Sequence, residues 1–291
     1  MLPYIYLISC VFFAASLSLF ASSFNKRNEG RKHDCTPLYN LIYVLCVVIG
    51  WSFIWATDFS FEIKVLPYSI LFAVGYAAAV MGLIISMKNG PMALTSLIFQ
   101  LSIVAVSVWG FIFWDSPVTA PVIIGLILVL LSLFFCLYTK KKEGEKGISL
   151  KWIICVGITF ISNGAISVIQ RQQPIDFNKQ HSSMMMFFGT FFAFIIILGF
   201  FLKSDKSEAK AVIKSSGIFP VLSGICNVLM NLFIIILATS KLSPSLIYPS
   251  IGVGGIIITT IFSVIALKEK KTVLQWIGII FGAAATVLLS I

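Results

Sequence analysis

Amide and phenol side chains inside long apolar runs are the residues of this chain best placed to bind a small molecule. Asn227 and Asn231 stand four residues apart and therefore share one face of a helix. Leaving a buried amide without a partner costs about 2 to 7 kcal/mol, so such side chains should face one another or a water-filled cavity. An amide both donates and accepts, which suits a zwitterionic or otherwise polar solute. The candidate substrate-binding residues are Tyr76, Gln100, Asn163, Asn227, Asn231 and Tyr248.

Hydrogen bonding between helices is the alternative role for polar residues in apolar runs, and for a single Ser or Thr it is the more frequent one. The residues concerned are Thr95, Ser96, Ser102, Ser250, Thr259 and Thr260. Tryptophans in the same runs fit packing or an interfacial aromatic belt, with stacking on a substrate as the rarer role. They are Trp51, Trp55, Trp109 and Trp114.

Charged side chains are missing from the centre of every apolar run. Because an intramembrane charge is the usual marker of an ion or proton relay, a carboxylate-switch mechanism is disfavoured. A possible coupling ion or proton would then use uncharged polar groups, the charge of the substrate, or a residue at the rim. The rim candidates, for which an ordinary solvated loop charge is the more frequent role, are Asp58, Glu62, Asp115 and Arg171.

Motifs for metal, nucleotide or covalent chemistry are missing from the sequence. The six cysteines form no CxxC pair, and His33 and His181 lie in separate polar segments, so we expect neither a metal site nor a cofactor. The chain has no GxxxxGK[ST] run for ATP. Two alternative classes stay open: a membrane-embedded enzyme would need an acid pair or a Ser/His dyad, and a channel would need charged rings or a carbonyl filter. We expect that the chain is not an enzyme.

The composition points to a membrane protein, since 59% of the residues are hydrophobic and 11% are charged. A helix of about 20 apolar residues crosses the bilayer, where every backbone polar group must be paired internally. Breaks at charged, Pro or Gly positions leave ten runs of that length. They cover residues 3–22, 38–57, 66–87, 91–114, 118–138, 149–169, 182–202, 218–239, 244–266 and 273–290. Eight or nine spans are the alternative, because the breaks before Pro91 and Pro117 are short enough to be kinks.

Glycine and proline mark two further features of these spans. Pro249 removes a backbone hydrogen bond inside the ninth span, so we expect a hinge or a bent gate there. The run from Gly252 to Gly255 and the pair Gly278 and Gly282 allow helices to approach closely. Packing within the chain is a more frequent reason for such spacing than dimerisation.

Basic residues alternate along the connections between the spans. Of the 21 Lys and Arg residues, 17 fall in the connections after spans one, three, five, seven and nine, and 4 fall in the others. Positive residues stay on the cytoplasmic side, so both termini are predicted to face outside. The net charge of +10 then serves contact with anionic lipid headgroups, and no nucleic-acid partner is expected. The expected location is a plasma membrane, which in a bacterium is the inner membrane.

A shift of 153 residues aligns the two halves of the chain. It pairs Pro67 with Pro220, Lys88 with Lys241, Pro91 with Pro244, Thr119 with Thr272 and Gly125 with Gly278. Five spans per half is an odd number, so the second half would enter the membrane in the opposite direction. Inverted repeats of this kind are typical of secondary transporters, which alternate access to a site near the midplane. The predicted units are residues 1–140, a basic linker at 141–150, and residues 151–291.

The end of the chain resembles the drug/metabolite transporter superfamily, and within it the ten-helix EamA-type members. The resemblance is carried by Ser243-Pro244-Ser245-Leu246-Ile247-Tyr248-Pro249, by Leu267-Lys268-Glu269-Lys270-Lys271-Thr272, and by Gln275-Trp276-Ile277-Gly278 with Gly282. In the first half, Trp114-Asp115 stands where that family has a Glu turn. The resemblance implies export or import of amino acids, metabolites, nucleotide sugars or drugs, with efflux among the directions.

These observations predict an all-α integral membrane protein of ten transmembrane helices, arranged as two inverted five-helix repeats. We expect a secondary transporter that moves a small polar or amphipathic metabolite or drug by alternating access, with the site at the repeat interface. Its expected partners are that substrate and the membrane lipids.

Overall fold

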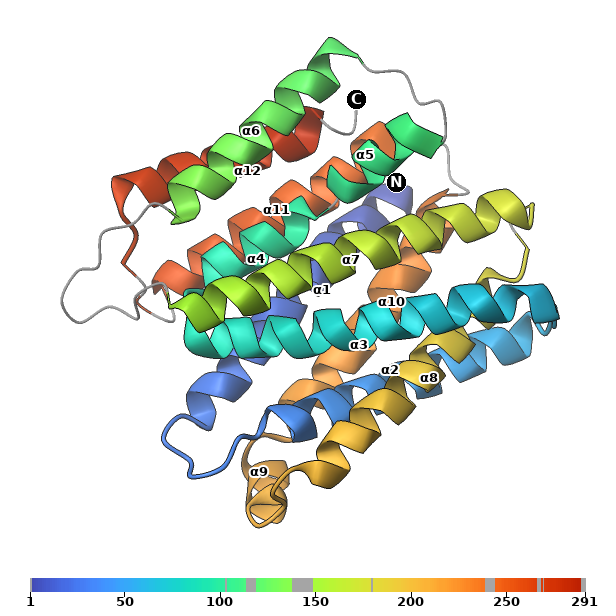
Figure 1. Ribbon diagram of the computed structural model, residues 1–291, viewed down its shortest axis with the longest axis vertical. Coiled ribbons are helices and arrows are strands. Elements are labelled where there is room, and N and C mark those ends of the chain that lie inside the picture. The colour runs from blue at the N-terminus through green and yellow to red at the C-terminus, as the bar shows by residue number, and fades with distance from the viewer. Residues whose placement is uncertain are drawn as a thin grey trace.

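The computed structural model describes residues 2–102, 104–113, 119–137, 149–178, 180–238, 244–265, 268 and 270–288. Within these ranges the chain is helical and has no strand (Figure 1). The elements are α1 (Leu2–Arg27), α2 (Thr36–Thr57), the 3-10 helix η1 (Ile63–Val65), α3 (Leu66–Asn89), α4 (Met92–Leu101), α5 (Val104–Phe113), α6 (Ala120–Leu137), α7 (Leu150–Asp176), α8 (Ser182–Lys203), α9 (Ala209–Ser216), α10 (Ile218–Ala238), α11 (Pro244–Ile265) and α12 (Val273–Leu288).

Five of the described helices are long and apolar enough to cross a membrane. They are α1, η1 with α3, α2, α7 and α8; α9 and α10, which meet at a bend of 63°, make a sixth if they count as one span. Shorter apolar helices follow at Ala120–Ser132, Ile251–Ile265 and Val273–Leu288. Large apolar side chains stand on the outside of the bundle, such as Phe53 and Ile161, both 70% exposed. Such a surface is unusual for a water-soluble protein and fits contact with lipid.

Local sequence signals explain where several helices begin and end. Pro37 and Pro67 occupy the first turns of α2 and α3, where a missing N–H costs nothing. Thr272 and Gln275 form a reciprocal capping box: each side chain accepts from the other residue's backbone N–H, at 3.3 and 2.9 Å. Basic residues close the last turns of α1, α3 and α8, where they complement the helix dipole.

The predicted fourth span differs from the structure, because the run 91–114 forms two helices of 10 residues each, α4 and α5. The Ser102 hydroxyl donates to the carbonyl of Phe99 at 2.6 Å, and the Asn163 amide of α7 donates to Ser102 Oγ at 2.5 Å. Side chains that bond the backbone in this way compete with the helix ladder. The helix α9 was also not predicted.

The helix ends gather at two ends of the bundle (Figure 1). We call the end at the lower left the basic end; it holds the connections at residues 28–35, 90–91 and 204–208, and several of its residues are basic. The opposite end holds the connection at 58–62 and the residues 177–178 and 180–181, together with the start of α1. Residues 141–148 of the predicted basic linker at 141–150, together with Trp114 and Asp115, lie outside the described residues.

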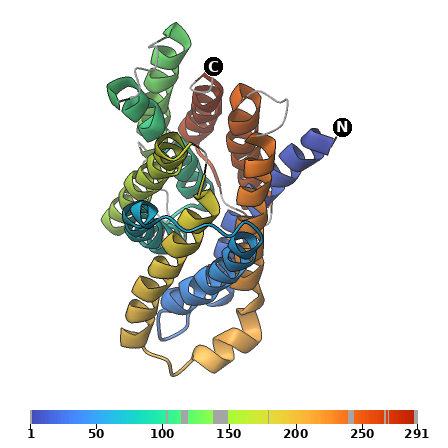
Figure 2. The same ribbon diagram turned by 90° about the vertical axis from the view of Figure 1, so that its right-hand side faces the viewer.

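Pairs of helices far apart in sequence make the main contacts. α3 packs along α7 and α8, α1 along α10 and α11, α2 along α8 and α10, and α6 along α12 (Figure 2). Small residues permit close approaches between further helices: a Cβ on Gly252 of α11 would meet Thr286 of α12 at 2.7 Å, and one on Gly282 of α12 would meet Leu97 of α4 at 2.5 Å. The glycine stripes therefore serve packing within the chain, as predicted.

Candidate functional site

Three tyrosines and an asparagine meet inside the bundle. The Tyr76 hydroxyl on α3 donates to the Tyr43 hydroxyl on α2 at 3.0 Å, and Asn227 on α10 lies in hydrogen-bonding contact with Tyr43. One turn earlier on α2, the Tyr39 hydroxyl lies 2.5 Å from Ser223 Oγ on α10. We call this group the phenol–amide cluster; it consists of Tyr39, Tyr43, Tyr76, Ser223, Asn227 and Asn231.

Ring stacking and close helix approach hold the cluster in place. Tyr43 stacks between Tyr39 and Tyr76, with ring centroids 6.2 and 6.5 Å apart, and Phe72 stacks on Tyr76 at 5.4 Å. A Cβ on Gly224 of α10 would lie 2.9 Å from the Tyr43 carbonyl, so the two backbones are nearly in contact. The hydroxyls are thus fixed by rings whose movement the neighbouring helices restrict.

Three members of the cluster lie well inside their helices, whereas Tyr39 is three residues from the start of α2. At 1.5 Å per residue, Tyr43, Tyr76 and Asn227 are about 10 to 15 Å from the nearest ends of α2, α3 and α10. Tyr76 and Asn227 are each 7% exposed. All six side chains are uncharged, so the site offers only neutral donors and acceptors beside aromatic faces.

Asn231 adds an amide one turn beyond Asn227. Its Nδ2 donates to the Asn227 carbonyl at 2.8 Å and approaches Asn227 Oδ1 at 3.4 Å. The two amides predicted to share a helix face are therefore in contact, and Tyr76 joins them through Tyr43. Three of the six predicted substrate-binding residues meet in this cluster.

Asn40 is a polar residue that the sequence reasoning missed. It precedes Tyr43 by one turn of α2, it is fully buried, and neither of its side-chain amide atoms has a partner in the described structure. An unpaired amide at zero exposure is costly, which makes Asn40 a further candidate for contact with a bound solute. An amide near the start of an apolar run was the available signal. Tyr39 and Tyr43, four residues apart, gave a similar signal on the same helix.

Gln100 and Asn163 are not joined to the cluster by any described contact. Asn163 donates to Ser102 Oγ and, at 3.4 Å, to the Phe99 carbonyl, so it ties α7 to the end of α4. Gln100 lies against α11, where a Cβ on Gly255 would meet its Nε2 at 2.7 Å. Gln100 thus points from the end of α4 toward α11, whereas Asn163 points from α7 toward the end of α4.

The remaining predicted residues take ordinary positions or stay untested. Pro249 and Tyr248 lie within the described backbone of α11, but their side chains are not among those described. Asp58 accepts from Ser183 at 3.4 Å, and Glu62 accepts from the Lys64 backbone. Among the described residues no group of three His, Cys, Asp or Glu could hold a metal.

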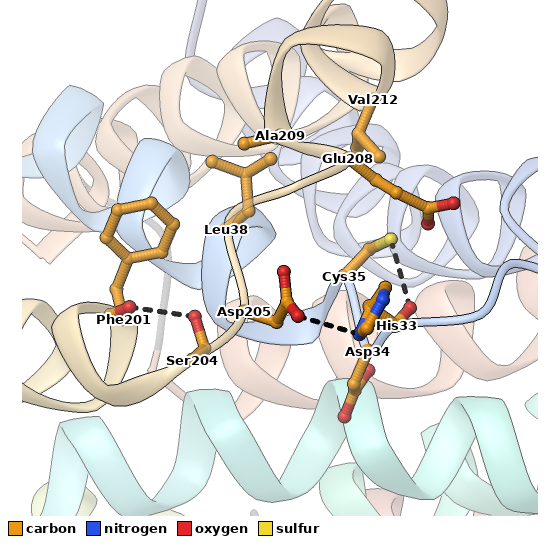
Figure 3. A pocket seen from close by; sticks show the side chains of 10 residues that line it. All are labelled: His33, Asp34, Cys35, Leu38, Phe201, Ser204, Asp205, Glu208, Ala209 and Val212. Atoms are coloured by element: carbon orange, nitrogen blue, oxygen red, sulfur yellow. Dashed lines mark hydrogen bonds and ion pairs between the residues drawn. The ribbon is translucent and has the colours of Figure 1, made fainter.

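A small recess at the basic end is lined by several titratable side chains (Figure 3). His33 Nδ1 lies 3.2 Å from Asp205 Oδ2, and Lys88 Nζ lies 2.9 Å from Asp34 Oδ1. Hydrogen bonds from Ser207 and the nearby His33 lower the pKa of Asp205. The recess is lined by His33, Asp34, Cys35, Leu38, Phe201, Ser204, Asp205, Glu208, Ala209 and Val212.

Comparison with known proteins adds the fold but no activity. No family model matches the chain. An uncharacterized protein of Haemophilus influenzae is 26% identical over 178 residues, a match that spans 60% of this chain and 58% of that protein. The match thus covers less than two thirds of the relative. A protein of known crystal structure superposes with a TM-score of 0.57 at 15% identity, over 99% of this chain and 97% of the other, which shows a shared fold.

Proposed function

We propose that this chain is a secondary transporter that moves a small neutral or zwitterionic metabolite or drug by alternating access, as in the EamA-type family it resembles. The observation that carries the proposal is the phenol–amide cluster. Its hydroxyls and amides come from α2, α3 and α10. If the chain consists of two repeats as we propose, α2 and α3 belong to the first and α10 to the second, which would put the cluster between them. A site between two halves is accessible from either side when the halves rock.

The pattern of helix contacts supports two related halves. Exchanging α1 with α7, α2 with α8, α3 with α10, α4–α5 with α11, and α6 with α12 turns the list of main contacts into itself. The contact of α3 with α7 becomes that of α10 with α1, and α3 with α8 becomes α10 with α2. The contacts of α2 with α8, α4 with α11 and α6 with α12 map onto themselves.

The direction of the helices supports inversion of the second half. In Figure 1, α1 runs toward the basic end whereas its counterpart α7 runs away from it, and α2 and α8 are opposed in the same way. In a repeat without inversion, the two helices of each corresponding pair would run in the same direction. We therefore propose ten spans in two inverted repeats, with α4 and α5 together forming the fourth.

The charge distribution supports the orientation. The basic end carries Arg31, Lys32 and Lys88, whereas Lys64 and Arg171 are the described basic residues toward the opposite end. We propose that the basic end faces the cytoplasm and both termini face outside, in a plasma membrane. The substrate would then pass between the cytoplasm, which the basic end faces, and the outside.

The test is binding followed by flux. Purified protein is melted in the presence of amino acids, sugars, nucleosides and amphipathic drugs, because a ligand that binds the folded state raises the melting temperature. Any compound that shifts melting is then measured for uptake into reconstituted vesicles. A transporter gives saturable flux; conductance that rises without saturation would indicate a channel, and chemical conversion of the compound would indicate an enzyme.

A matched pair of variants ties the flux to the site. Asn227→Ala removes an amide of the cluster, and we expect at least a tenfold rise in the half-saturating concentration, equivalent to about 1.4 kcal/mol. Asn89→Ala removes an amide that only bonds its own helix, to the Ile85 carbonyl at 2.7 Å, and should leave transport unchanged. Equal effects of the two variants would contradict the placement of the site. If no tested compound binds or moves while the protein is folded, the proposed function fails.

A further inference from the structure

α2 and α8 form an antiparallel pair with a histidine contact at each end. Both helices have 22 residues, and they pack along one another. At the basic end, His33 before α2 pairs with Asp205 after α8, at 3.2 Å between Nδ1 and Oδ2. At the opposite end, His181 before α8 contacts Ser60 after α2, at 2.9 Å between Nδ1 and Oγ. We call these contacts the basic-end clasp and the opposite-end clasp.

The two clasps are equivalent by exchange of the halves. In each, a histidine from the connection that precedes one helix reaches a residue just beyond the end of the other. The sequence has two histidines, and both are used in this way. A helix of 22 residues is about 33 Å long, close to the roughly 30 Å of bilayer hydrocarbon, so the clasps close the pair on the two faces of a membrane.

Further polar contacts surround each clasp and connect it to neighbouring helices. At the basic end the connection 28–35 also bonds α3 and α9, through the pairs Asp34–Lys88, Arg31–Ser215 and Asn28–Ser216. At the opposite end the bonds are Ser183–Asp58, Ser182–Gln173, the Gln173 amide to the Gln180 carbonyl, and Tyr68–Asp176. His181 also has a backbone φ of 63°, a left-handed conformation that is unfavourable for a residue other than glycine.

The clasps differ in chemistry. The basic-end clasp joins an imidazole to a carboxylate, and its side chains are 30% and 47% exposed. The opposite-end clasp joins an imidazole to a neutral hydroxyl. Tyr43 lies seven residues inside α2 from the basic end, so the phenol–amide cluster is enclosed between the two closures.

We propose that the two clasps are the gates of the transport cycle, one on each membrane face, and that His33–Asp205 and His181–Ser60 must open in turn for a solute to reach the cluster. This rests on the proposed function. Each clasp ties together an element of the first half and one of the second, so separation of the halves at either face breaks one clasp. The clasp residues position the helices and do not touch the solute.

A cysteine already present in the chain reports whether the cluster is accessible. Cys226 on α10 is half-buried and lies close enough to Tyr39 and Tyr43 to interact with their hydroxyls. A chain that keeps Cys226 alone is made by replacing Cys35 with Ser, since its thiol bonds the His33 carbonyl, and the other cysteines with Ala. A membrane-impermeant maleimide is then applied to right-side-out and inside-out vesicles.

The expected result is side-specific. His33→Ala and Asp205→Ala should raise the labelling rate of Cys226 at least threefold from the basic face and leave it unchanged from the other. His181→Ala and Ser60→Ala should do the reverse. Lys32→Ala and Gln180→Ala, which remove exposed side chains next to each histidine, are the matched controls and should change neither rate.

Two outcomes overturn the inference. Labelling that rises equally from both faces, in variants whose melting temperature has fallen, means that the clasps only stabilise the fold; unchanged labelling means that they do not restrict access. His33→Gln and His181→Gln, which keep a hydrogen-bonding side chain, should give smaller increases than the alanine variants. Labelling needs no substrate, so the clasp inference can fail while flux is normal, and absent flux would reject the proposed function whatever the labelling shows.

Discussion

Tyr76 on α3 donates its hydroxyl hydrogen to the hydroxyl oxygen of Tyr43 on α2, and the two oxygens lie 3.0 Å apart in the buried interior of the bundle. Tyr43 in turn contacts Asn227 on α10, so one hydroxyl links the three helices α2, α3 and α10. Linked hydrogen bonds in a region of low dielectric polarise one another. Tyr43 is therefore the central member of the phenol–amide cluster.

Replacing Tyr43 by Phe should weaken both stability and solute binding. The ring and its stacking stay, but Tyr76 and Asn227 each lose a partner, which costs about 1 to 3 kcal/mol per buried group left unpaired. We expect a lower melting temperature and at least a tenfold weaker affinity for any solute found by the binding screen. Tyr4→Phe is the control, because Tyr4 is 54% exposed and should change neither quantity. Unchanged affinity in Tyr43→Phe would place the solute elsewhere.

Two glycines of α7 should respond in opposite ways to alanine. A Cβ on Gly164 would meet the Ala105 Cβ at 2.6 Å and the Ser102 carbonyl at 3.2 Å, neither of which can rotate away, whereas a Cβ on Gly157 meets nothing within 4 Å. Gly164→Ala should therefore destabilise the protein by about 1 to 3 kcal/mol. Gly157→Ala should be neutral or slightly stabilising, since Ala favours a helix over Gly by up to about 1 kcal/mol. Thermal unfolding in detergent measures both, and equal changes would contradict the packing of α7 on α5.

The positions of the helices could be predicted because apolar runs in a bilayer have few other ways to pair their backbone. The predicted range 38–57 corresponds to α2 at Thr36–Thr57, and 182–202 to α8 at Ser182–Lys203. The break between α4 and α5 was not predicted. The contact made there joins Ser102 to Asn163, 61 positions away in sequence, and local sequence patterns do not reveal such a contact. The short helix α9 has little apolar character and escaped a search for spans.

The candidate site was predicted only in part, for a related reason. Spacing along one helix identified Asn227 and Asn231 as neighbours, since that relationship is local. Which helix faces them depends on packing, so Tyr43 and Asn40 on α2 were missed. Gln100 and Asn163 look equally polar in the sequence, but they approach α11 and α4 respectively and make no described contact with the cluster.

Removing the Asn163 side chain should destabilise the junction of α4 and α5. Asn163→Ala leaves Ser102 and the Phe99 carbonyl without a donor from α7, at a cost of about 1 to 3 kcal/mol if water does not replace it. Ser167→Ala, four residues along the same helix, removes a hydroxyl that only bonds the carbonyl of residue 163 and should cost much less. Hydrogen exchange of the α4 amides should accelerate in the first variant alone. Equal exchange in the two variants would mean that Asn163 does not hold the junction.

The ion pair between Asp34 and Lys88 should contribute stability only above the pKa of the carboxyl group. Burial raises the pKa of Asp34, but hydrogen bonds from Lys88 and Thr36 outweigh it and hold the pKa below its usual value of 3.8. A lowered pKa in the folded state means that the pair stabilises at neutral pH and that this stability is lost as the pH falls through the lowered value.

Both side chains of the ion pair are about half exposed, so the contribution should stay below about 1 kcal/mol and shrink in high salt. Asp34→Asn should therefore melt at a lower temperature than the parent at pH 7, and this difference should narrow as the pH falls below about 3.8 toward the lowered pKa. The double variant Asp34→Asn with Lys88→Gln should be no less stable than Asp34→Asn alone, because the lysine by then has no carboxylate partner. A gap between parent and Asp34→Asn that stays constant from pH 7 to pH 3 would show that the carboxylate charge is not what stabilises the basic end.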